Sequence, residues 1–107
     1  MRKLFVLCAV LFLAACSAAI KLSAPSQTDA DRASKTFPGL TLADLNSGKT
    51  AYEENCAKCH RLKNPVNFSE EKWRKVLPPM AKKAKIDAKT EDLILKYVVT
   101  MSGVKKQ

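Results

Sequence analysis

The chain has 107 residues, which allows one small domain together with additional terminal segments. Its formal net charge of +9 favours an anionic partner such as an acidic protein or a lipid surface, although scattered lysines also serve solubility alone. Lys82, Lys83 and Lys85 form the densest basic run, and because no aromatic residues interleave with them, the pattern argues against a nucleic-acid surface.

Residues 1–15 have the pattern of an export signal. Arg2 and Lys3 give it a positive start, and an apolar stretch follows at residues 4–13. The signal predicts that the rest of the chain works outside the cytoplasm, on the periplasmic side of a bacterial membrane.

The signal ends in the sequence LAAC at residues 13–16, which resembles the bacterial lipobox. The resemblance implies that Cys16 becomes the lipidated N-terminus of the mature chain and anchors it to a membrane. The serine that follows, by resemblance to other lipoproteins, slightly favours the outer membrane over the inner one. The alternative is an uncleaved transmembrane helix over residues 4–20, which is short for the roughly 20 residues that a span needs.

We expect the next segment, residues 16–39, to form the lipidated N-terminus and a flexible tether. It is rich in small and polar residues, contains two prolines, and shows no sustained helical or strand period.

From Leu40 onward the pattern becomes helical and nothing indicates strands, so the fold class is all-α with a domain over residues 40–107. Thr41 predicts the cap of a first helix, because Asp44 lies three residues later in capping-box register. That helix should run to about Asn55.

Ser69 predicts the cap of a second helix, with two glutamates in its first turn. Pro78 should end this helix, because a proline disfavours helical backbone at the residue before it. Pro79 then favours the start of a short third helix.

Asp87 or Thr90 should cap the last helix, and Gly103 should end it. Four apolar residues on this helix follow the i, i+3, i+4, i+7 spacing of one buried face: Ile94, Tyr97, Val98 and Met101.

The sequence Cys56-Ala57-Lys58-Cys59-His60 carries the main functional signal. This C-x-x-C-H pattern is typical of covalent c-type haem attachment, with two thioether bonds to one porphyrin edge and the histidine as the proximal iron ligand. The alternatives are a disulfide, a thioredoxin-like redox pair, for which a βαβ pattern is missing, and a zinc site, for which acidic residues would have to complete the ligands.

His60 is the only histidine in the chain. A haem iron therefore cannot take two histidine ligands from one molecule. Its sixth ligand would be Met, Lys, Asn, water or nothing.

With these residues the sequence resembles the class I monohaem cytochromes c. Gly48, Tyr52 and Cys56 have the spacing of the glycine, aromatic residue and first haem cysteine in that family's first helix, and Ile94 and Tyr97 match its last helix. The resemblance covers residues 40–101 and implies a small fold of three to four helices around one haem c. It also implies that the two helices cross at the glycine, with the two tyrosines in contact.

The resemblance further implies a distal methionine, for which Met80 is the candidate. The alternative is that Met80 only fills the core, and Met101 is the second choice as ligand. Trp73 is either a residue of the haem pocket with its indole near a propionate or an apolar anchor of its helix. Pro65 is a candidate for accepting a hydrogen bond from His60, although its spacing departs from the family pattern.

The sequence therefore predicts a membrane-tethered electron carrier rather than an enzyme. Lys58, Lys63, Lys82 and Lys83 would attract an acidic redox partner. The alternative function is a haem-based sensor or ligand-binding module with an open distal site. A peroxidase is disfavoured, because no second histidine remains to serve as its acid–base group, and a role as a subunit of a larger membrane oxidoreductase stays open.

Overall fold

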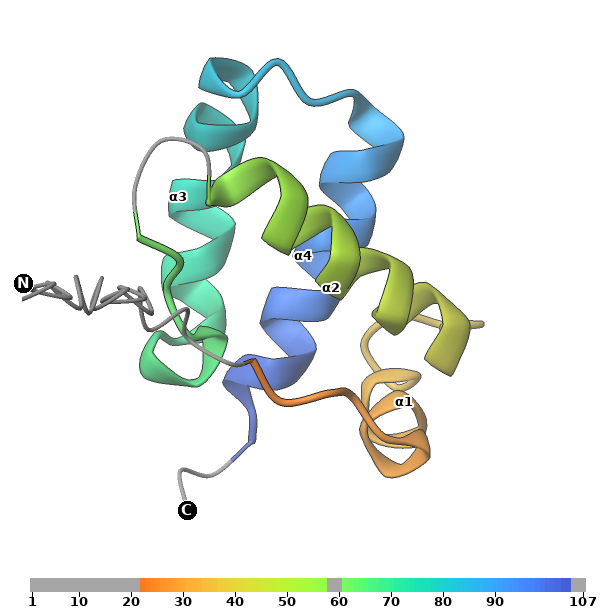
Figure 1. Cartoon of the computed structure of the whole chain (residues 1–107). Helices are drawn as coiled ribbons and strands as arrows, with labels where there is room; N and C mark the ends of the chain where they lie inside the picture. Colours follow the sequence, from red (N-terminus) through yellow and green to blue (C-terminus); the bar gives the residue numbers. More distant parts are fainter. Residues whose placement is uncertain (1–21, 58–60, 105–107) are drawn as a thin grey trace, which may run out of the picture.

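The computed structural model describes residues 22–57 and 61–104, and this part of the chain contains helices, turns and no strand (Figure 1). The all-α prediction is confirmed for these residues. In chain order the elements are α1 (Gln27–Ala33), α2 (Leu42–Cys56), the short 3₁₀ helix η1 (Pro65–Asn67), α3 (Glu70–Lys83) and α4 (Ala88–Ser102).

The last helix, α4, is the centre of the fold, because α1, α2, η1 and α3 all pack on it. The predicted apolar face is confirmed: Ile94 and Val98 are fully buried, and Tyr97 and Met101 are nearly so. The close approach of α2 at Gly48 is also confirmed. A Cβ at position 48 would collide with the Leu93 carbonyl oxygen and lie 2.8 Å from the Tyr97 Cβ.

The predicted helix starts are confirmed by their capping hydrogen bonds. The Asp44 backbone N–H donates to Thr41 Oγ1 at 3.1 Å while the Asp44 carboxylate accepts from the Thr41 backbone N–H at 3.0 Å. Ser69 Oγ accepts from the Lys72 backbone N–H at 3.1 Å. Of the two candidates for the last helix, Asp87 is the cap, and its carboxylate accepts from the Thr90 backbone N–H at 2.7 Å.

The prediction that Pro78 ends its helix is wrong, because α3 continues through both prolines to Lys83. Pro78 and Pro79 are exposed, so the carbonyls that lose their helical partners lie on the solvent side of the helix. The opposite face of α3 is buried, with Leu77 just before the prolines and Ala81 just after them. Burial on both sides of the pair outweighs the local preference to break the helix.

The prediction of a flexible segment before residue 40 is corrected over its described part. Helix α1 lies there, started by a capping box in which Ser26 and Asp29 exchange hydrogen bonds. Ala30 and Ala33 of α1 are buried, and the helix packs on α2 and α4. The sequence S-x-x-D at residues 26–29 signals the start of α1. The helix was not predicted, because its buried residues are alanines, which give only a weak apolar pattern.

Candidate functional site

Part of the predicted haem motif lies outside the described residues. Cys56 is the last residue of α2, whereas Lys58, Cys59 and His60 follow in the segment that is not described. Cys16 and the export signal also lie outside the described part. The roles of Cys59, His60 and Cys16 therefore stay predictions.

An aromatic cluster fills the space between α2, α3 and α4. The Tyr52 ring lies 6.0 Å from the Tyr97 ring, centroid to centroid, which confirms the contact implied by the cytochrome resemblance. Tyr52 also meets Trp73 edge-on at 5.9 Å, and Phe68 meets Trp73 at 5.4 Å. The sequence analysis missed Phe68. Its signal was its place just before the Ser69 cap, where an apolar residue commonly packs on the residue five positions later.

Trp73 and Pro65 are brought together by a direct hydrogen bond. The Trp73 indole N–H donates to the Pro65 carbonyl oxygen at 3.0 Å, and the Phe68 backbone N–H donates to the same oxygen at 3.3 Å. Both lone pairs of that carbonyl therefore have protein donors. Because Trp73 is only 2% exposed, this geometry favours its interpretation as an apolar anchor of α3.

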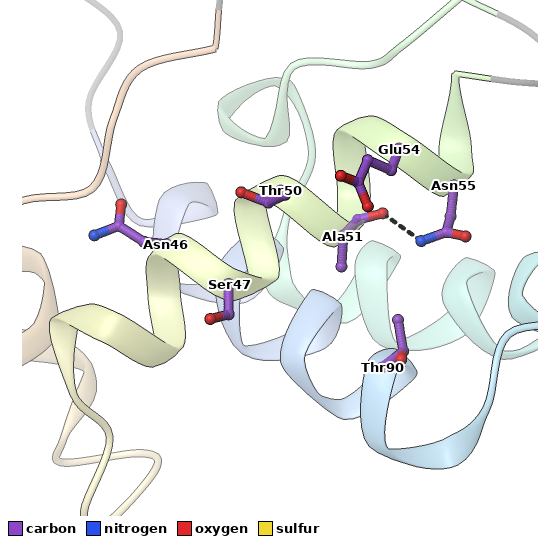
Figure 2. Close-up of a pocket in the computed structure, with 7 residues that line it drawn as sticks. All are labelled: Asn46, Ser47, Thr50, Ala51, Glu54, Asn55 and Thr90. Carbon is purple, nitrogen blue, oxygen red and sulfur yellow. Dashed lines mark hydrogen bonds between the residues drawn. The ribbon is translucent and has the colours of Figure 1, made fainter.

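Cys56 lies at the end of α2 that reaches the first turn of α4. A polar groove of about 480 Å³ joins the two helices, and Figure 2 shows Thr90 of α4 opposite the last turns of α2. The Asn55 side-chain amide in this groove donates to the Ala51 carbonyl oxygen at 2.8 Å. The groove is lined by Asn46, Ser47, Thr50, Ala51, Glu54, Asn55 and Thr90.

Met80 lies at this same end of α4. It belongs to the last turn of α3, and a tight turn connects that helix to α4, with the Ile86 backbone N–H donating to the Ala81 carbonyl at 3.0 Å. Lys85 takes a φ of 55° to reverse the chain. Met80 and Cys56 are both half-buried against the main core. The second methionine, Met101, is 3% exposed and lies in the last turn of α4, at its opposite end.

The Tyr52 hydroxyl binds the segment that follows the C-x-x-C-H sequence to α2. It donates to the Lys63 carbonyl oxygen at 2.5 Å. Burial raises the pKa of Tyr52 above its ordinary value, and the neighbouring Cys56 raises it further. The phenol is therefore a neutral hydrogen-bond donor one helical turn before Cys56.

Three exposed lysines lie close to Met80 in sequence, at the end of α3 and in the turn that follows it. Lys82, Lys83 and Lys85 are exposed, and none of them makes an ion pair within the described part of the chain. The ion pairs that this part does contain link residues three or four positions apart on one helix, such as Lys96 with Asp92 at 2.6 Å. These three lysines therefore keep their charge available to a partner.

Within residues 22–57 and 61–104, no group of three or more His, Cys, Asp or Glu side chains is placed to hold a metal ion. None of the helices in the same ranges is both long and apolar enough to cross a membrane.

Comparison with known proteins adds no family. No protein-family model matches the sequence, and no curated protein or solved structure is significantly similar to it.

Proposed function

We propose that the chain is an exported monohaem c-type cytochrome that is lipid-anchored through Cys16 and transfers single electrons between redox partners. The observation that carries the proposal is the C-x-x-C-H sequence, which begins at Cys56 on the last residue of α2.

Two features of the described residues support the proposed covalently attached porphyrin. Cys56 and Met80 come from different helices but lie at the same end of α4, and both are half-buried, so their sulfur atoms are not sealed inside the core. Further half-buried apolar side chains lie on the same core and would give the macrocycle an apolar wall: Leu62, Phe68, Val76 and Ile86.

A haem bound there would supply a one-electron iron couple. Cys56 and Cys59 would hold its edge through thioether bonds, His60 would be the proximal ligand and Met80 the distal one. A thioether ligand favours the reduced metal and raises the potential. Tyr52 and Trp73 pack beside this site and fix α2 and α3 relative to α4, which keeps the positions of Cys56 and Met80 constant.

The direct test is to express the full-length chain in a bacterial host with working cytochrome c maturation machinery. The mass of the purified protein should contain one haem, and the pyridine spectrum after denaturation should be that of a thioether-bound haem. Cys56→Ser should leave a single thioether bond, with the corresponding shift of the pyridine absorption band. A protein of unmodified mass would refute the proposal.

The assignment of Met80 has a matched control in the same chain. Met80→Leu should remove the ferric sulfur-to-iron absorption band and lower the reduction potential. Met101→Leu, a volume-conserving change at the other end of α4, should leave both unchanged. Loss of the band only in the Met101 variant would move the ligand to that position.

The same samples decide between an electron carrier and a gas sensor. With Met80 on the iron, reduced wild-type protein should bind carbon monoxide slowly or not at all at neutral pH, whereas Met80→Leu should bind it rapidly. Rapid binding by the wild type would favour the sensor.

A further inference from the structure

The two ends of α4 carry different parts of the proposed machinery. We call the end at Thr90 the redox pole, because Thr90 shares a groove with the last turns of α2 and α4 begins there just after the turn from α3. The other end, at Thr100, we call the anchor pole, because the N-terminal segment of the described chain is fastened there. Thr100 lies ten positions after Thr90 in the same helix, so the poles lie about 15 Å apart along the helix axis.

The N-terminal segment binds to the anchor pole through both apolar and polar contacts. Leu22 is 6% exposed and belongs to the main core, and Pro25 is buried as well. The Arg32 guanidinium donates to the Thr100 carbonyl oxygen at 2.8 Å, which satisfies a carbonyl of the last turn of α4. Figure 1 shows the described chain beginning beside this end of α4, while α3 ends at the other pole.

The length of chain before Leu22 limits how far the domain can move from a lipid anchor. Cys16 precedes Leu22 by six residues. Six residues span at most about 20 Å even when fully extended. The segment that the sequence suggested as a long tether is largely bound to the fold, since α1 and Leu22 both pack on it.

We infer that the N-terminal segment, residues 22–33, orients the domain on the bilayer. The inference rests on the proposed lipidation and haem attachment. The anchor pole faces the lipid surface and the redox pole faces the aqueous phase, so the partner is a redox protein that approaches from the water side. The exposed lysines at the redox pole, Lys82, Lys83 and Lys85, make an acidic partner surface the complementary one.

The test compares two spin-label positions on the lipidated, haem-loaded protein in phosphatidylcholine vesicles that contain a nickel-chelating lipid. Gly103→Cys places a label at the anchor pole, where a Cβ meets only ordinary contacts, with the nearest atom 3.6 Å away. Lys83→Cys places one on the exposed surface of the redox pole. The nickel headgroups should enhance relaxation of the label at 103 several-fold more than at 83. Equal enhancement, or more at 83, would overturn the inference.

A second pair of variants tests whether residues 22–33 cause the orientation. Ala30→Glu puts a charge at a position that is 1% exposed and should release α1, and Arg32→Ala removes the bond to Thr100 while leaving the core intact. Each should reduce the difference between the two label positions, Ala30→Glu more strongly, with circular dichroism confirming that α2–α4 remain helical. A difference unchanged in both variants would contradict the inference.

Two further readouts separate the possible failures. The mass of the extracted protein reports the lipid and the haem before any labelling, and an unmodified mass would overturn the proposed function and the inference together. Correctly modified protein with equal relaxation at both labels would overturn the inference alone. Vesicles with anionic lipid should give the same order of the two labels, and reversal there would assign the lysines to the lipid surface instead.

Discussion

The two apolar clusters of this small protein are built from very different side chains. The main core between α2, α3 and α4 contains Tyr52, Trp73 and Tyr97, all at most 2% exposed. The second cluster, between α1 and α2, is made of two alanines and two leucines: Ala30, Ala33, Leu40 and Leu45. Buried area per residue is therefore much larger in the main core, so most of the hydrophobic stabilisation lies there.

The contrast suggests that α1 is attached to a core that does not depend on it. Phe37 connects the two clusters, because it packs against both, and the Arg74 guanidinium lies 5.6 Å from its ring centre. A cluster of small residues loses less when it opens, so the α1 region should be the first part of the fold to unfold locally.

The largest expected effect comes from the closest contact in the main core. Gly48→Val should prevent cooperative folding, because the new side chain would overlap the Leu93 backbone and Tyr97 Cβ, neither of which can move without separating α2 from α4. Thermal unfolding of the purified protein, followed by circular dichroism, measures this. Gly39→Ala, where a Cβ meets nothing within 4 Å, is the control, although its φ of 82° makes a small cost expected. Normal folding of Gly48→Val would disprove the close crossing.

Truncation within the aromatic cluster should have the next largest effect. Trp73→Ala is expected to lower the free energy of unfolding by about 3–5 kcal/mol, because it leaves a large cavity beside Tyr52 and Phe68. Denaturant unfolding followed by circular dichroism gives the value. Trp73→Phe keeps most of the ring but loses the hydrogen bond to Pro65, so its smaller loss separates packing from the polar contact.

At the α1 region a comparable change should cost far less. Arg32→Ala is expected to lower stability by about 1 kcal/mol, since it removes a partly buried hydrogen bond to Thr100 and an exposed ion pair with Asp29. Hydrogen exchange should show faster opening of α1 with the protection of α4 largely retained. A loss as large as that of Trp73→Ala would mean that the two regions unfold as one unit.

The smallest effects should come from the caps of the main helices α2 and α4. Hydrogen bonds from the Thr41 backbone lower the pKa of Asp44, and those from the Thr90 backbone lower that of Asp87. Each carboxylate therefore stabilises the fold above its unfolded pKa of about 3.9, and this contribution is lost as the pH falls through the lower folded value. Asp87→Asn should keep the cap and flatten the acid limb of the pH–stability curve, and an unchanged limb would contradict this origin.

The sequence predicted the parts of the fold that depend on local chemistry. Thr41, Ser69, Asp87 and Gly103 bound the helices as expected, because capping hydrogen bonds form within a few residues. The continuation of α3 through Pro78 was not predicted. It depends on the burial of α3 against α4, and a local sequence pattern contains no information on that packing.

At the candidate site, the sequence predicted some contacts, and others depend on the three-dimensional fold. The contact of Tyr52 with Tyr97 was expected from the resemblance, whereas the partner of the Trp73 indole was not, because it depends on how η1 folds back over α3. Likewise α1 went unnoticed, since two buried alanines become visible as core only once α2 and α4 are in place.

The Tyr52 hydroxyl bond to Lys63 closes a ring of the chain that contains the C-x-x-C-H sequence, and ten residues lie between its two ends. The entropic cost of closing a loop grows slowly with its length, so this short ring adds little to the cost of ordering the segment. Extra residues inserted between positions 57 and 62 would enlarge the ring that this hydrogen bond closes, whereas residues added after Lys63 would leave the ring unchanged. Tyr52 thus holds the chain at Lys63, just beyond the C-x-x-C-H sequence, against α2.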